Sequence, residues 1–446
     1  MIKFLVIFLF IFLTNCSLDK ASGFWSKSKK IEKIEKIEKI EKSELKEVFK
    51  EATNLRKELN IDLQINLSSK LIKNSFVNNL DNNNGRIDYE GDLKSISRFK
   101  FSKIDNFNNF EPEIVFDKKN LIFFDNKGSI LKFNEQSKLI WKSNNYNKSE
   151  RKAKPILFMA TNKKTLIVAD NISKYYAVNI ETGEILWTKN NTAPFNSQVK
   201  IYRDKFFVID FDDILRCFSL KNGIELWRVK TETSFIKSQK KLSIIIINKK
   251  VYFNNSIGDI SAVDIDSGDL LWQTPTQNNS IIEDSFSTKT SDLIADNDSI
   301  FFSNNKNEFY SLDIKTGLLN WKQSVNSNLR STLIDNLIFS ISNDGFLIII
   351  NSMNGNIIRI TDVMKVLNID YLIKRFRKRT QILPVGFIVG TKNIYLTTNN
   401  GKLIIVDVLH GQPLNVLKID NEKISRPFVL NKDLFIVKDN SIIKLN

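Results

Sequence analysis

Residues 262–272 read AVDIDSGDLLW, and this pattern decides how the rest of the chain is interpreted. It returns as AVNIETGEILW at 177–187 and as SLDIKTGLLNW at 311–321. Weaker copies read LKFNEQSKLIW (131–141), CFSLKNGIELW (217–227), IINSMNGNIIR (349–359) and IVDVLHGQPLN (405–415). A unit that recurs at intervals of roughly 40 to 50 residues is typical of a repeat architecture, so the repeat takes precedence over local patterns.

Each copy is predicted to be a β-hairpin. An Asp or Asn such as Asp264 hydrogen-bonds nearby backbone in an Asx turn, and a Gly such as Gly268 adopts the positive φ that other residues resist. The Trp that follows stands on the second strand, where its large ring can pack between neighbouring sheets. We expect structural docking roles for Trp141, Trp187, Trp227, Trp272 and Trp321.

The repeats predict an all-β fold. A four-stranded sheet cannot bury both of its faces alone, but several sheets arranged radially can. Seven turns are followed by a last strand at 439–446 that has no turn, which indicates an eighth blade completed by a strand near 93–104. Such closure removes free sheet edges. The sequence therefore predicts an eight-bladed β-propeller over residues 91–446.

The first sixteen residues are typical of an export signal. A short basic start, Met1 to Lys3, precedes the apolar run Phe4 to Leu13, which is too short to span a bilayer. The ending LTNC at 13–16 resembles a bacterial lipobox, in which the Cys is acylated and the chain is cut before it. We therefore expect a lipoprotein signal peptide at 1–15 and lipidation of Cys16. The alternative is an ordinary secretory signal with an incidental Cys.

Residues 16–90 are predicted to form a tether. The tract IEKIEKIEKIEK at 31–42 pairs Glu with Lys at i,i+4, but its period of three builds no single apolar face, so we interpret it as a semi-helical spacer. Apolar residues over 43–59 fall on one face of a predicted helix with Ser43 as its N-cap. The Asn-rich stretch 60–90 is interpreted as a linker.

The net charge of +16 raises the question of a polyanionic partner. Lysines are spread along the chain, which favours a solvated surface, because only clustering marks a binding footprint. The one dense basic cluster lies in 365–379, where contact with anionic membrane and a solvated loop remain open. Few aromatic residues interleave with it, so no nucleic-acid partner is predicted.

The pattern A-x-D-x-x-T/S-G-x-x-x-W resembles the tryptophan-docking repeat of the pyrroloquinoline-quinone-type propellers. Two families share this repeat, so the fold alone does not choose a function. In quinone-dependent dehydrogenases a disulfide of adjacent cysteines and a calcium ion hold the cofactor, whereas this chain has only Cys16 and Cys217. Cys217 matches the small-residue position of Ala262, and His410 occupies a turn. No catalytic residue, metal site or cofactor is therefore predicted.

The second family is that of the outer-membrane protein assembly lipoproteins, the BamB family, which are lipidated propellers of this kind. This resemblance implies a non-catalytic, monomeric scaffold that is lipid-anchored at the periplasmic face of the outer membrane. It further implies binding to the barrel-inserting subunit, with unfolded outer-membrane proteins as a second kind of partner. The alternatives are a quinoprotein-type dehydrogenase and an unrelated protein-binding propeller lipoprotein.

The predicted partner surface lies on two loops, 228–241 and 273–291. Connections from the outer strand of one blade to the inner strand of the next emerge on one face, so the loops are expected to be neighbours. An apolar centre with a charged rim is usual for a protein interface, although packing under the blade edge is the alternative. The residues concerned are Phe235, Ile236 and Lys237 in the first loop and Ile281, Ile282, Glu283 and Asp284 in the second.

Overall fold

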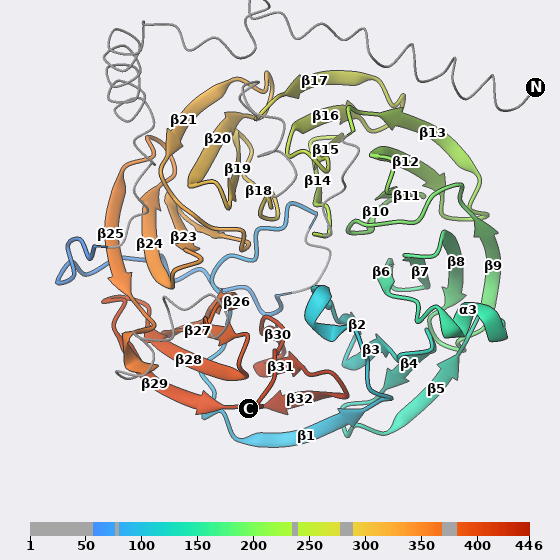
Figure 1. The fold of residues 1–446 in the computed structure, drawn as a ribbon, viewed down its shortest axis with the longest axis horizontal. Helices are drawn as coiled ribbons and strands as arrows, with labels where there is room; N and C mark the ends of the chain where they lie inside the picture. Colours follow the sequence, from blue (N-terminus) through green and yellow to red (C-terminus); the bar gives the residue numbers. More distant parts are fainter. Residues whose placement is uncertain (1–56, 76–79, 234–239, 277–288, 368–380) are drawn as a thin grey trace, which may run out of the picture. The chain divides into compact units, whose positions relative to one another are not determined.

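The structure is a computed structural model that describes residues 57–75, 80–233, 240–276, 289–367 and 381–446. Within these ranges, eight four-stranded antiparallel sheets stand around a common axis (Figure 1). Each sheet is one blade, with one edge strand at the axis and the other edge strand at the rim. The predicted eight-bladed β-propeller is confirmed.

The first four blades follow one another along the chain. Their strands are β2 (Val115–Asp117), β3 (Asn120–Phe124), β4 (Ile130–Phe133) and β5 (Leu139–Ser143) in blade 1; β6 (Leu157–Thr161), β7 (Thr165–Asp170), β8 (Lys174–Asn179) and β9 (Ile185–Asn190) in blade 2; β10 (Lys200–Tyr202), β11 (Lys205–Ile209), β12 (Ile214–Ser219) and β13 (Glu225–Lys230) in blade 3; β14 (Ile244–Ile247), β15 (Lys250–Asn254), β16 (Ile260–Asp264) and β17 (Leu270–Thr274) in blade 4.

The next three blades continue the same order. Their strands are β18 (Ile294–Ala295), β19 (Ser299–Asn304), β20 (Glu308–Asp313) and β21 (Leu319–Gln323) in blade 5; β22 (Thr332–Ile334), β23 (Leu337–Ile341), β24 (Phe346–Asn351) and β25 (Ile357–Asp362) in blade 6; β26 (Pro384–Val389), β27 (Asn393–Thr398), β28 (Lys402–Asp407) and β29 (Pro413–Lys418) in blade 7. Short helices are η1 (Phe107–Asn109), α3 (Lys148–Lys152) and η2 (Lys365–Leu367). None of the helices in the described ranges has the length and hydropathy of a membrane-spanning segment.

Blade 8 is built from both ends of the described chain. It contains β30 (Phe428–Leu430), β31 (Asp433–Val437) and β32 (Ser441–Leu445), and its outer strand is β1 (Ser95–Lys100). β1 pairs antiparallel with β32, with Arg98 opposite Ile443 and Phe99 opposite Ile442. The expectation that a strand from 93–104 closes the ring is confirmed.

The hairpins form as the turn chemistry predicts. In blade 4, the Asp264 carboxylate accepts hydrogen bonds from the backbone N–H groups of Asp266 and Ser267, both at 2.9 Å. Gly268 then takes a φ of +81°, which L side chains rarely adopt. These local hydrogen bonds determine the turn without any contact between blades.

Each of the five repeat Trp rings lies over the turn Gly of the following blade. A Cβ on Gly268 would stand 2.7 Å from Trp227, and one on Gly317 would stand 2.5 Å from Trp272. Four of the indoles also donate to a backbone carbonyl in the next blade; the Trp321 Nε1–H to Ser352 O distance is 2.9 Å. The ring and the glycine are therefore complementary parts of one contact between blades.

Arg359 replaces the Trp in blade 6. A Cβ on Gly411 of blade 7 would stand 2.6 Å from its Nη2, so the guanidinium occupies the place of the indole. Arg359 is fully buried and donates from Nη1 to the backbone oxygens of Leu63 and Leu409. It therefore joins blades 6 and 7 to a residue that lies before the propeller in sequence.

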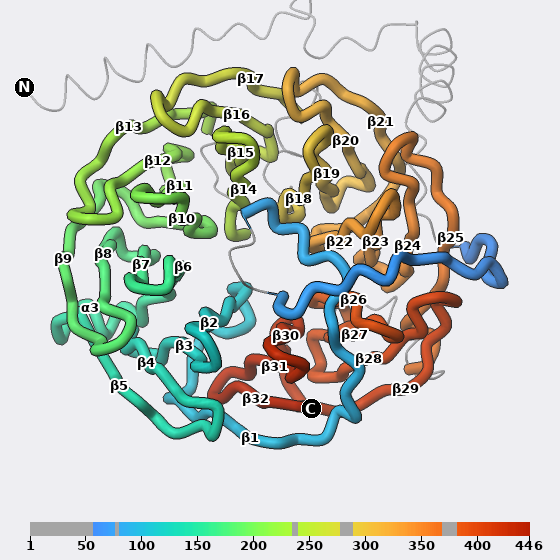
Figure 2. Tube along the Cα trace, turned by 180° about the vertical axis from the view of Figure 1, so that it is seen from behind, coloured from blue at the N-terminus to red at the C-terminus, as the bar shows by residue number. Residues whose placement is uncertain are grey.

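The segments 57–75 and 80–94, together called the strap, run across one face of the propeller (Figure 2). Near the rim, Leu59 exchanges backbone hydrogen bonds with Ile360. The strap then reaches the inner strands of blades 8 and 4, where Ser75 N–H donates to Val429 O and Ile246 N–H donates to Leu80 O.

After Leu80 the strap crosses back over blade 7 to the rim. Ile87 N–H donates to Val389 O at 2.8 Å, and Ile87 and Tyr89 are fully buried. Leu93 N–H donates to Asn446 O, after which the chain enters β1. The stretch interpreted as a linker therefore packs against the propeller in its described parts.

Most of the other tether predictions concern residues outside the described ranges. The IEK tract and residues 43–56 of the predicted helix lie outside the described residues, as does Cys16. Residues 57–59, the last of the predicted helix, are not helical, because Leu59 pairs with the outer strand of blade 6.

We predict that Trp272→Ala lowers the free energy of unfolding by about 2 to 4 kcal/mol. This is somewhat less than the loss of a fully buried indole, because the ring is only partly buried. Urea unfolding of both the variant and the native chain measures the change. The matched control is the neighbouring Leu271→Ala, which is 44% exposed and should change stability by less than about 0.5 kcal/mol. Equal effects of the two variants would contradict docking of the Trp.

Candidate functional site

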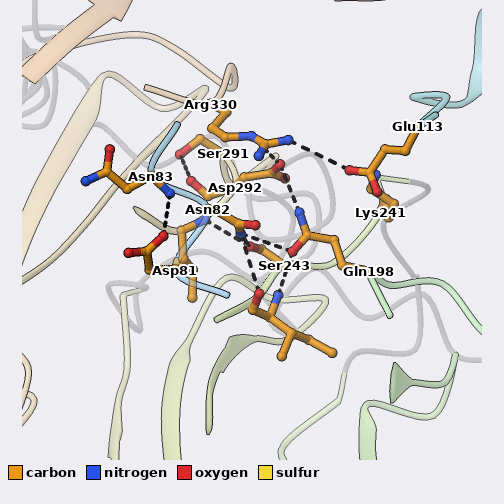
Figure 3. Close-up of polar contacts among 12 residues, drawn as sticks. Asp81, Asn82, Asn83, Glu113, Gln198, Lys241, Ser243, Ser291, Asp292 and Arg330 are labelled. Carbon is orange, nitrogen blue, oxygen red and sulfur yellow. Dashed lines mark hydrogen bonds and ion pairs between the residues drawn. The ribbon is translucent and has the colours of Figure 1, made fainter. Parts of the chain in front are cut away.

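Charged and amide side chains gather where the inner strands converge (Figure 3). Five of them occupy the same place in their blades, two residues before the inner strand begins, and Lys241 joins them from the segment before β14. We call this group the axial cluster; its members are Glu113, Gln198, Lys241, Asp292, Arg330 and Arg426.

Ion pairs connect the axial cluster across the axis. Lys241 Nζ lies 2.8 Å from Glu113 Oε1, and Arg330 Nε lies 3.1 Å from Asp292 Oδ2. The Gln198 side chain donates to the same Asp292 oxygen at 3.1 Å. The side chains of Lys241 and Asp292 are each 6% exposed, so these charges are held by one another and not by bulk water.

The strap inserts an amide into this group. Asn82 is 1% exposed, and its Nδ2 donates to Gln198 Oε1 and Ser243 Oγ, both at 3.0 Å. Lys200 Nζ donates to Asn82 Oδ1 at 2.6 Å. One strap residue thereby connects blades 3 and 4 at the axis.

The electrostatics hold the two carboxylates in their charged form. Burial by itself raises the pKa of Glu113, but the charges of Lys241, Arg330 and Arg426 outweigh it and lower the pKa to about 2. Burial likewise opposes ionisation of Asp292, whose pKa is lowered to about 2 chiefly by Arg330 and Lys241. Carboxylates this acidic are poor general bases at neutral pH, so the cluster fits an electrostatic role better than acid–base catalysis.

The predicted partner residues Phe235, Ile236, Lys237, Ile281, Ile282, Glu283 and Asp284 all lie outside the described residues. The ends of their loops are described. Before the first loop, Thr231 Oγ1 donates to Asp213 O, and before the second, Thr276 N–H donates to Asp259 Oδ1, each at 3.0 Å.

Asp213 and Asp259 belong to the turns between the second and third strands of blades 3 and 4. In an antiparallel meander these turns lie at the end of the blade opposite the first and third turns. The strap bonds to such first and third turns, for example from Ser68 N–H to Asp335 and from Ile65 N–H to Leu409. The two loops therefore leave neighbouring blades on the face opposite the strap.

Cys217 and His410 carry reactive side chains, but both have structural roles. Cys217 is fully buried opposite Trp227 in the β12–β13 pair, and burial raises the pKa of its thiol to about 12. His410 is exposed in a turn, with Nδ1 2.9 Å from Asp407 Oδ1. Among the described residues, no three His, Cys, Asp or Glu side chains are grouped as a metal site would require.

The axial cluster was not among the residues predicted from the sequence. The repeat pattern lies on the outer hairpins, so it does not align the residues before the inner strands. A signal was present, because Ser precedes the axial residue in three blades and its hydroxyl accepts a backbone N–H from the second strand. These Ser–acceptor arrangements are Ser197 with Ile209, Ser291 with Ser303 and Ser425 with Val437.

The family described as outer membrane protein assembly factor BamB matches residues 126–361, which is more than half of the chain. The chain belongs to this family. The resemblance inferred from the repeats is thereby confirmed. A search among curated proteins gave no match.

Solved structures agree on the fold. BamB from Moraxella catarrhalis is 16% identical with a TM-score of 0.63, covering 79% of this chain and 99% of that one. The designed Ika8 protein is 11% identical, with a TM-score of 0.57 and coverage of 78% and 99%. Quinohemoprotein alcohol dehydrogenase from Comamonas testosteroni is 9% identical, with a TM-score of 0.59 and coverage of 81% and 78%. At these identities the likeness extends to the fold alone.

We predict that Glu113→Gln destabilises the protein by about 2 kcal/mol at pH 7, because it leaves buried basic groups without their partner. The Glu113 pKa is about 2 in the folded state, below its ordinary 4.5. Its contribution to stability is therefore present above pH 4.5 and is lost as the pH falls through about 2. The difference between variant and native chain should shrink over that window in urea unfolding.

The control is Glu135→Gln, which removes an exposed ion pair with Lys119. It should change stability by less than about 1 kcal/mol. A Glu113→Gln effect that stays constant from pH 7 to pH 2 would contradict the proposed electrostatic role.

Proposed function

We propose that the protein is a non-catalytic scaffold lipoprotein at the periplasmic face of the outer membrane, where it binds the barrel-inserting subunit of the β-barrel assembly machinery. The observation that carries this proposal is membership of the BamB family over most of the propeller. Export and anchoring through Cys16 form part of the proposal, on the signal-like sequence at 1–16.

A scaffold role is favoured over a dehydrogenase role by the cysteines. The chain carries two, Cys16 and Cys217, so it cannot form the disulfide of adjacent cysteines that quinone-dependent dehydrogenases use. Cys217 is moreover buried and has a raised pKa, which keeps its thiol protonated at neutral pH. The quinohemoprotein dehydrogenase shares only the fold with this chain.

The loop face supports the choice of partner surface. The two loops that carry Phe235–Lys237 and Ile281–Asp284 begin on neighbouring blades, on the face that the strap leaves uncovered. We propose that this face binds the barrel-inserting subunit, with the apolar pairs at its centre.

Unfolded outer-membrane proteins are the second proposed partner. Each sheet ends at its outer strand, which presents backbone groups to an added strand. Aliphatic side chains are exposed beside the turn Gly of several outer hairpins; Leu318 is 69% exposed and Ile224 is 53% exposed. An extended apolar chain could add to such an edge.

The partner proposal is tested by affinity purification of the full chain from membranes with mass spectrometry. We expect recovery of the barrel-inserting subunit, and a decrease of at least about tenfold for Phe235→Glu/Ile236→Glu, because charges at an interface centre are strongly unfavourable. The control Leu318→Glu/Leu319→Glu places the same charges on an outer strand of blade 5 and should retain the subunit. Undiminished recovery with the loop variant would refute this surface.

Titration calorimetry tests the enzyme alternative directly. Pyrroloquinoline quinone should give no calcium-dependent heat of binding at micromolar concentrations, because the disulfide platform is missing from the sequence. Stoichiometric binding at one site that requires calcium would instead favour a dehydrogenase.

A further inference from the structure

A cavity of about 500 Å³ lies beside the axial cluster on the strap side. This volume is within the range of small-molecule sites. Its walls come from the start of blades 1, 2, 3, 6 and 8 and from the strap, including Leu80 and Asn82. The scaffold function proposed above makes no use of it.

One side of the cavity is apolar. Phe116 stands on β2, Met159 and Ala160 on β6, and Leu430 ends β30. Phe116 and Met159 retain 9% and 8% exposure, although most of the surrounding core side chains are almost fully buried. The exposed parts of these two side chains line the cavity, which is large enough for the apolar part of a ligand.

The charged groups of the cavity are mostly basic. Its acidic side chains have basic partners: Glu113 lies 2.8 Å from Lys241 and 3.8 Å from Arg330, and Asp117 lies 2.8 Å from Lys132. The lining also holds the basic side chains of Lys118, Lys163, Lys200, Arg330 and Arg426, of which Lys118 pairs with Glu181 and Arg330 with Asp292.

Burial is the largest cause of the pKa shifts of two of these bases. It lowers the pKa of Lys200 to about 7, with a further contribution from the charge of Arg330, although Glu113, Asp292 and Asp81 act in the opposite direction. Burial and Arg330 likewise lower the pKa of Arg426 to about 9. An anion beside these groups would stabilise their charged forms.

We propose that this cavity binds a small amphipathic anion. A carboxylate, sulfonate or phosphate group would lie at Lys200 and Arg426, and its apolar body would pack against Phe116 and Met159. Charge-assisted hydrogen bonds to lysine and arginine give such a site its preference for anions. This inference does not depend on the scaffold function.

The probe is 1-anilinonaphthalene-8-sulfonate, whose fluorescence increases in an apolar site, added to the folded full chain. N-phenyl-1-naphthylamine, which has the same rings without the sulfonate, is the matched uncharged probe. We expect the sulfonate to bind at one site, at least about tenfold more tightly than the uncharged probe, and to raise the melting temperature. Equal affinity for the two probes would overturn the proposal.

Two variants locate the site by independent means. Arg426→Gln removes a cation, and Ala160→Phe fills the apolar side without touching a charge. Each should weaken sulfonate binding at least about tenfold. The control Lys289→Gln removes the same charge at the opposite mouth of the axis, where Lys289 lies with Asn196 and Phe211, and should bind normally. Unchanged binding by Ala160→Phe, with its fold verified by circular dichroism, would refute this location.

Displacement of the sulfonate probe distinguishes an amphipathic anion from a simple inorganic anion as the ligand. Decanoate should displace the sulfonate probe, because it supplies both the charge and the apolar body. Inorganic phosphate should displace it at least about tenfold less well, because it makes no apolar contacts. Equal displacement by both would mean a simple anion site and would overturn the amphipathic assignment.

Discussion

The pairing of β1 with β32 is the interaction on which the rest of the molecule depends. The Trp–Gly contacts join each blade only to the next one, so by themselves they would give an open arc with two bare edges. The strand at Ser95–Lys100 turns that arc into a ring. Because β1 follows directly after the strap, closure also determines where the strap must run.

Closure creates the unusual environment at the axis. The residues that precede five inner strands are brought together there, and they are charged or amide side chains and not apolar ones. Charges with little water around them are tolerated only when they are paired and hydrogen-bonded. The strap contributes Asn82, whose neutral amide both donates and accepts hydrogen bonds. It therefore adds no further charge to the axis.

The ring was predictable from the sequence because its rules are local. A turn such as Asp264 to Gly268 is determined by its own residues, and the missing last strand of blade 8 follows from counting the repeats. The strap was not predictable in the same way. Its residues pair with backbone groups of blades 4, 6, 7 and 8, and no periodicity marks a segment whose partners lie far away in sequence. The replacement of a Trp by Arg359 indicates an additional packed segment, because a buried guanidinium needs carbonyl partners. One of these partners is Leu63 of the strap.

The contact between the end of the strap and Asn446 at the rim affects the rate of folding. Lys94 and the residue that accepts its hydrogen bond, Asn446, are separated by 352 positions. Each hairpin forms from residues that are close together in the sequence, whereas this contact requires Lys94 and Asn446 to meet. Contacts between such distant positions carry a large loop-closure entropy and slow the search for the native state. We therefore expect blades 1 to 7 to form before β1 pairs with β32 and closes the ring.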